Sequence, residues 1–429
     1  MPDINQQKRE ANNLRKQGQI KEALPLYREL WKKTGDEFDG AGLIQCLRKM
    51  ELFDEAIVLA DEMLDKYPDF EWGRNECIWA YIQGTLSNIR EDTPCQTVVD
   101  KANRIMSLNP QGLAIKAVVF RVLKAAKSSN HWNIVNEWIN KLDPSSLNIN
   151  PIKTDSGREG WSEQSQWYNY RIRGIIEEHN NNELAEALTL ADKAIQLFPK
   201  QNKFFLRLKA LTYSLLGSYK ESAEIYNNLC SRPNPDWWLL HEYAKVHQAQ
   251  GHEEEALMLM YQAASSHHKL ESMVNLFSDI GMLCHKLKKY GEARAHLALC
   301  KYVREDRGWS IPEQITSTVN DINRHLNDSE PFSQKEAYDM CRSEWRRQLH
   351  DEGLKQVAVE ERKARRGLTG KINSIIDDRP FCFIITKDRN SFFCSKSELP
   401  ATINNGDEVS FDAIPSYLLC IKCITPPSK

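Results

Sequence analysis

The stretch LAEALTLADKAIQLFP, from Leu184 to Pro199, decides the fold of most of this chain. It opens with a bulky residue, one spacer, a glutamate and a small residue, Ala187, and its proline follows that alanine by twelve positions. A proline cannot continue a helix, so the stretch predicts a helix that ends at Pro199.

The opening of this stretch recurs along the first three quarters of the chain. Its small residue returns at Ala23, Ala56, Ser222, Ala256 and Ala293, the copy at Ala256 being the weakest. Successive gaps are 33, 131, 35, 34 and 37 residues, and four of these five lie near the period of a helix–turn–helix repeat. A small side chain at this place lets the two helices of one unit cross closely.

Other positions keep the same period. Gly18, Gly217 and Gly251 each precede a small residue by five positions and predict the turn between the two helices of a unit. Within the long gap, CQTVVDKANRIMSLNP and HWNIVNEWINKLDP are interpreted as second helices without the small residue. The tryptophans are interpreted as core side chains rather than as a stacking surface: Trp132, Trp161, Trp167, Trp237 and Trp238.

This pattern resembles the tetratricopeptide repeat over residues 5–325, with about eight units. The resemblance implies a mainly α fold, an α-α solenoid over residues 1–330, with a polar insertion at about 145–165. Solenoids of this family expose a concave face that holds a protein or peptide partner.

A more specific ligand is suggested by the first helix. Chaperone-binding members of the family use a Lys-x-x-x-Asn motif there, which Lys8 and Asn12 match. The next family position, an asparagine, is Gly42 in this chain, so the motif is incomplete. The alternative interpretation is that Lys8 and Asn12 are solvated helix residues.

The repeat period is lost after residue 330. Residues 333–366 are predicted to form one helix, with Ser333 as N-cap and Glu336 three residues later. This helix makes up the linker segment, residues 331–366. The end of this segment is basic and includes Arg362, Lys363, Arg365 and Arg366. It is interpreted either as a solvated helix end or as a patch that contacts phosphates.

Residues 367–429 have a different character. Alternating apolar residues and short turns predict five strands, and this length suits a small closed five-stranded β-barrel of the oligonucleotide-binding (OB) type. The segment resembles a cold-shock domain, with Gly370-Lys371-Ile372, Pro380-Phe381-Cys382-Phe383-Ile384, Ser391-Phe392-Phe393-Cys394-Ser395 and Gly406-Asp407-Glu408-Val409-Ser410-Phe411 at the family's motif positions. The resemblance implies binding of single-stranded RNA.

Strand geometry indicates how such binding would work. Phe381 and Phe383 are two residues apart and therefore point to one face, which Phe392 of the next strand is expected to join, while Cys382 faces the core. Exposed rings on a sheet offer stacking surfaces worth about 1–3 kcal/mol per base. With Lys371 and the basic side chains above, these rings are the predicted nucleic-acid contacts. One alternative is that the rings pack against the preceding helix. Another is that the barrel binds protein, because residues 367–429 hold seven basic and seven acidic residues and therefore attract phosphates weakly.

Composition limits the remaining classes. The chain has 429 residues, a formal net charge of -2, no apolar segment of membrane-spanning length and no signal-type N-terminus, which predicts a cytoplasmic protein. Its 11 cysteines are expected to be reduced. His241 and His247 are wrongly spaced for a helical metal site, and Cys420 and Cys423 form a lone CxxC pair. We therefore expect no catalytic residues, metal or cofactor, and predict an adaptor that binds a protein and RNA; the alternative is a purely protein-binding scaffold.

Overall fold

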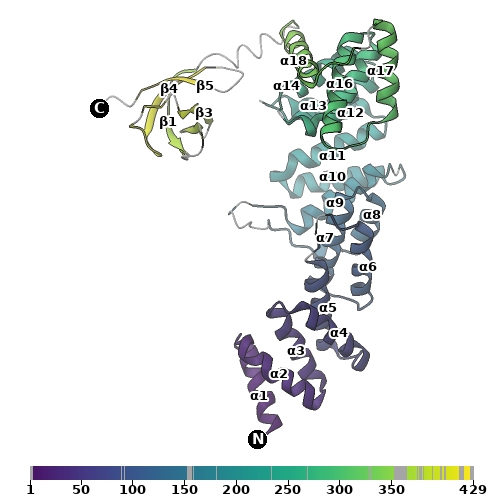
Figure 1. Cartoon of the computed structure of the whole chain (residues 1–429), viewed down its shortest axis with the longest axis vertical. Helices are drawn as coiled ribbons and strands as arrows, with labels where there is room; N and C mark the ends of the chain where they lie inside the picture. The colour runs from purple at the N-terminus through teal and green to yellow at the C-terminus, as the bar shows by residue number, and fades with distance from the viewer. Residues whose placement is uncertain are drawn as a thin grey trace. The chain divides into compact units, whose positions relative to one another are not determined.

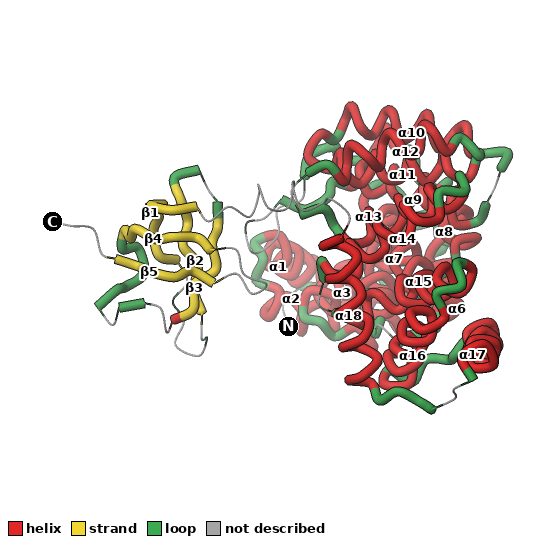
Figure 2. The backbone as a smooth tube through the Cα atoms, turned by 90° about the horizontal axis from the view of Figure 1, so that it is seen from above, coloured by secondary structure: helices red, strands yellow, loops and turns green. Residues whose placement is uncertain are grey.

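The computed structural model is mainly helical, and the residues it describes form eighteen α-helices and a small C-terminal β-sheet (Figures 1 and 2). It divides into two units, residues 1–232 and 233–429. For 350–351, 365–366, 414 and 420–425 only the backbone is described. The structure describes residues 3–87, 89–90, 92–151, 157, 159–179, 181–232, 234–267, 269–327, 330–351, 365–373, 375, 379, 381–388, 390–396, 399–400, 402–414 and 420–425.

The first sixteen helices follow one another as eight pairs, which confirms the predicted helical repeat. In seven pairs the two helices pack directly on each other, and in the third pair the second helix packs instead on the π-helical turn that continues the first. In the first unit the pairs are α1 (Ile4–Lys16) with α2 (Ile20–Thr34), α3 (Glu37–Lys49) with α4 (Phe53–Lys66), α5 (Glu71–Tyr81) with α6 (Cys95–Met106), α7 (Leu113–Ser128) with α8 (Trp132–Ile139), α9 (Glu163–Glu177) with α10 (Leu184–Leu197), and α11 (Asn202–Leu215) with α12 (Tyr219–Cys230). In the second unit they are α13 (Trp237–Ala249) with α14 (Glu253–Ser265) and α15 (Val274–Lys286) with α16 (Tyr290–Asp306).

The small residues of the repeat lie where the helices of a hairpin meet. All six are fully buried, and Ser222 satisfies its hydroxyl by donating to the carbonyl of Ala210 at 2.8 Å. The predicted turn glycines adopt left-handed backbone, as at Gly217 with φ 76°. Glu51 and Lys288 hold the same turn position at φ 59° and 60°, so the turn geometry is kept where glycine is absent.

The degenerate stretch between the clear repeats is helical as predicted. Both stretches interpreted there as second helices are helices, α6 and α8, and α5 continues into a π-helical turn, Ile82–Leu86. Of the tryptophans assigned to the core, Trp132 and Trp167 are buried, whereas Trp161, Trp237 and Trp238 are half-buried. In the predicted polar insertion, the described residues before α9 form only one 3-10 turn, Pro144–Ser146.

Two further helices follow the last hairpin, α17 (Glu313–Leu326) and α18 (Gln334–Asp351). Ser333 and Glu336 form the predicted capping box, with the Ser333 N–H donating to Glu336 at 2.8 Å and the Glu336 N–H donating to Ser333 Oγ at 3.3 Å. α18 packs against α14 and α16. Its Trp345 stacks on Phe277 of α15, with ring centroids 5.9 Å apart.

The prediction of one helix as far as Arg366 is wrong at its end. α18 is described as far as Asp351, and Arg365 and Arg366 belong to the first strand, where Arg365 pairs with Ala413. Strand pairing with a partner more than forty residues later prevails there over the local helical preference. Arg362 and Lys363 lie outside the described residues.

The C-terminal sheet, drawn in yellow in Figure 2, is antiparallel. It has five strands in the order β3-β2-β1-β4-β5. Its strands are β1 (Arg365–Asn373), β2 (Phe381–Thr386), β3 (Ser391–Ser395), β4 (Glu408–Ile414) and β5 (Cys420–Thr425), and side chains are described on the first four. In the described residues β3 and β5 remain edges, so the sheet is curled and open, and the predicted closed barrel is not confirmed.

One face of the sheet forms a small core. The core residues are Ile372, Cys382, Ile384, Cys394, Val409 and Phe411. Gly370 permits the close approach of β1 and β2, because an added Cβ would lie 2.7 Å from Ile384 and 2.9 Å from the carbonyl oxygen of Ile385. The opposite face of the sheet is therefore left for other contacts.

Candidate functional site

The candidate site is the outer face of the β2–β3 hairpin. Along β2, Cys382 and Ile384 are fully buried, whereas Phe381 and Phe383 alternate with them and stay half-buried. This confirms that the two phenylalanines share one face and that Cys382 turns inward. Burial raises the pKa of the Cys382 thiol, so it stays a neutral core side chain.

The third ring of this face is Phe393, and the prediction for Phe392 is wrong. Phe393 lies directly opposite Phe383, and directly opposite residues of an antiparallel pair share a face. Phe392 lies opposite the buried Ile384 and packs on Phe411, with ring centroids 5.2 Å apart. Two adjacent phenylalanines cannot both point outward, and only the strand register shows which of them does.

We call Phe381, Phe383 and Phe393 the aromatic face. The centroids of Phe381 and Phe393 are 5.1 Å apart with ring planes at 32°. Phe383 stands edge-on to both, at 5.8 Å from Phe381 and 6.2 Å from Phe393. The three rings form one apolar cluster on a sheet surface, on the side away from the core.

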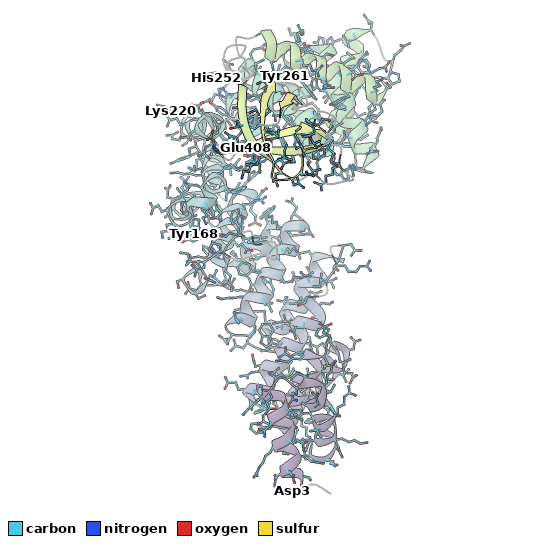
Figure 3. The ribbon with its side chains drawn as sticks, turned by 90° about the vertical axis from the view of Figure 1, so that its left-hand side faces the viewer. Asp3, Tyr168, Lys220, His252, Tyr261 and Glu408 are labelled. Carbon is cyan, nitrogen blue, oxygen red and sulfur yellow. The ribbon has the colours of Figure 1, made fainter. Side chains whose placement is uncertain are left out.

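Lys371 lies at the rim of the aromatic face. It is exposed on β1, and its cross-strand neighbours are Ile385 on β2 and Glu408 on β4. Since Asn373 lies opposite Phe383, alternation along β1 places Lys371 on the same side as the three rings. Glu408, labelled in Figure 3, puts a carboxylate beside this lysine, so the rim is not strongly basic.

The other predicted phosphate contacts are only partly located. Arg365 and Arg366 begin β1, and their side chains are not described, while Arg362 and Lys363 lie outside the described residues. The structure thus brings Lys371 and two of the three predicted rings together, and adds Phe393.

Lys8 and Asn12 are engaged inside the first unit. The Lys8 amine forms ion pairs with Asp39 at 3.1 Å and Asp36 at 3.4 Å. Burial lowers the pKa of Lys8, but these two carboxylates outweigh it and leave the pKa raised. Asn12 accepts a hydrogen bond from Arg15 at 2.8 Å.

The third position of that motif is closed. A Cβ on Gly42 would lie 2.3 Å from Tyr27 Cε1, so an asparagine does not fit there unless Tyr27 moves. The Lys8 amine also forms ion pairs with aspartates that lie 28 and 31 residues later in the chain. The sequence motif therefore gives no open carboxylate-binding site in this structure.

The described residues show no group of three or more His, Cys, Asp or Glu side chains that could hold a metal ion. Cys382 and Cys394 face each other across β2 and β3 within the core.

None of the helices in the described part of the chain has both the length and the apolar character for crossing a membrane.

Comparison with known proteins gives a partial family match. A family model described as a domain of unknown function, DUF7017, matches residues 203–343, from α11 into α18. A tetratricopeptide repeat protein from Parabacteroides merdae is similar at 12% identity and a TM-score of 0.30, over 64% of this chain and 96% of that one. No curated protein matches the chain.

Proposed function

We propose that this chain is a non-enzymatic adaptor, which binds a protein partner through its helical hairpins and single-stranded RNA through the aromatic face. Arrays of helical hairpins are typical of protein-binding scaffolds, because stacked units expose long surfaces. The observation that carries the RNA half is the cluster of Phe381, Phe383 and Phe393 on the sheet face opposite the core.

The proposed chemistry is base stacking. Each phenyl ring offers a flat apolar surface to an unpaired base, and such stacking tolerates any base because every base has a π-face. A duplex hides those faces, so the site prefers single strands. Lys371 at the rim supplies one phosphate contact, and the basic residues at 362–366 are proposed to supply the others.

We also propose that the sheet is a cold-shock-like barrel. Its two edges, β3 and β5, approach each other with Cα atoms within 8 Å, so one further ladder would close it. The motif order found in the sequence and the position of Gly370 at a close strand contact support this assignment.

A titration of the full chain with a fluorescein-labelled single-stranded RNA tests the proposal. Replacing Phe381 and Phe383 together with alanine should weaken binding by about 2–4 kcal/mol, since two stacking surfaces are lost. Phe38→Ala is the matched control, because it removes an exposed ring (56% exposed) from the helical part of the chain. Equal affinities for all three proteins, or no RNA binding at all, would contradict the proposal.

The second candidate is a scaffold that binds only proteins. It is favoured by the placement of Glu408 beside Lys371 and by the zero net charge of residues 367–429, both of which weaken attraction to phosphates. In that case the aromatic face binds an apolar peptide, and binding of the full chain to RNA shows no dependence on the three rings. Salt dependence separates the two candidates further, since phosphate contacts weaken steeply with salt.

A further inference from the structure

A second aromatic cluster lies at the start of two successive first helices in the N-terminal unit. Phe38 lies in the first turn of α3, Phe70 directly precedes α5, and Trp72 lies in the first turn of α5. Ring centroids are 4.8 Å apart between Phe38 and Phe70 and 6.3 Å between Phe38 and Trp72. Phe38 is 56% exposed, more than any other phenylalanine or tryptophan in the described chain. We call these three residues the Phe38 patch.

The surroundings of the Phe38 patch are acidic. Glu37, Asp69 and Glu71 flank its rings in sequence, and none of them forms an ion pair with another described residue. One cation lies close by: the amine of Lys66 donates to the carbonyl of Gly35 at 3.0 Å and lies 5.2 Å from the ring centroids of Trp31 and Tyr67. Glu37 and Asp69 also line a hollow of about 390 Å³ beside Phe70 together with Lys66, so two carboxylates and one ammonium group face it.

The chain itself shows what this surface accepts. The guanidinium of Arg15 lies over the ring of Trp72, 4.9 Å from its centroid. Arginine stacks on aromatic faces while its N–H groups remain available to oxygen acceptors. A second guanidinium that stacked on Phe38 would have Glu37 and Asp69 close by as partners.

We propose that the Phe38 patch binds a basic, arginine-bearing segment of a partner protein. The proposal deepens the protein-binding half of the proposed function and rests on it. Helix N-termini by themselves favour anions, which argues for the opposite charge. Here Asp36 caps α3 by accepting from the N–H of Phe38 at 3.0 Å, and an acidic ligand would meet three carboxylates against the single ammonium group of Lys66.

The test uses the full chain and two short fluorescein-labelled peptides, one alternating arginine with leucine and the other alternating glutamate with leucine. We expect the arginine peptide to bind and the glutamate peptide not to bind. Phe38→Ala should weaken the arginine peptide about tenfold, the size of a partly desolvated cation–π contact. The double change Glu37→Lys and Asp69→Lys, which keeps all three rings, should weaken it as well.

Two controls make the outcome specific. Val58→Ala changes a side chain that is 70% exposed on α4 and should leave peptide affinity unchanged. The alanine double variant of Phe381 and Phe383 should lose RNA but keep the arginine peptide, so failure of this proposal is distinguishable from failure of RNA binding. Equal affinity of the Phe38→Ala and Val58→Ala variants for the arginine peptide, or tighter binding of the glutamate peptide to the unmodified chain, overturns the proposal.

Discussion

Acidification should loosen the docking of α18 through one buried histidine. His296 on α16 is 1% exposed, and its Nε2 accepts a hydrogen bond from the Trp345 indole N–H at 2.8 Å. An indole N–H only donates, so Nε2 carries no proton, and Nδ1 donates to the carbonyl of Glu292 at 2.7 Å. The folded state therefore requires a neutral imidazole.

The size of the effect follows from the two pKa values. Burial lowers the pKa of His296 from 6.5 to about 4, so between these values the unfolded chain binds a proton that the folded chain does not. Stability contributed by this group is complete above pH 6.5 and falls as the pH drops toward 4. At 1.4 kcal/mol for each pH unit, the interval removes about 3 kcal/mol.

Hydrogen exchange measured by mass spectrometry at several pH values would measure this loss of stability in individual segments. Peptides from α16 and α18 should lose protection, corrected for chemical exchange rate, as the pH falls from 6.5 to 4.5. The double variant His296→Leu with Trp345→Phe removes both hydrogen-bonding partners and should lose most of that pH dependence. His252→Leu, an exposed histidine of the same unit, is the matched control.

Glu292 acts in the opposite direction. Burial and the nearby Glu344 raise its pKa, so it favours the folded state more as the pH falls. Both carboxylates remain in the double variant, and the difference between the two proteins isolates His296. Identical pH profiles for the unmodified chain and the double variant would refute the reasoning.

Three further changes test the fold by urea unfolding followed by circular dichroism. Ala187→Leu should destabilise by about 1–3 kcal/mol because it overfills a fully buried crossing, whereas Ala185→Leu, exposed on the same helix, should change stability little. Gly217→Ala should cost about 1 kcal/mol because its φ is 76°, whereas Gly291→Ala, in a helix with open space around it, should stabilise by up to about 1 kcal/mol. Phe392→Ala should lower the urea midpoint of the sheet by removing the contact with Phe411, and an unchanged midpoint would favour the outer face for Phe392.

The helical repeat could be predicted from sequence because its signals are local. A small residue such as Ala256 marks the crossing of two helices within one hairpin, and Gly251 marks the turn five residues earlier. Both depend on neighbours in the same unit. Even the weakest copy of the pattern therefore falls at a fully buried position.

The errors arose where distant residues decide the outcome. Whether Phe392 or Phe393 points outward depends on strand register, and a shift of one residue exchanges the faces. The strand conformation of Arg365 depends on its pairing with Ala413, 48 residues later. The ion pair of Lys8 with Asp39, on another helix, is likewise not visible in the local Lys-x-x-x-Asn motif.

The most direct test of the central claim is photochemical crosslinking of the full chain to a single-stranded RNA, with the attached peptides identified by mass spectrometry. We expect crosslinks within residues 381–393, at the rings of the aromatic face, and their loss when Phe381 and Phe393 are replaced by alanine. Crosslinks confined to other segments, or none at concentrations that saturate a control RNA-binding protein, would contradict the account.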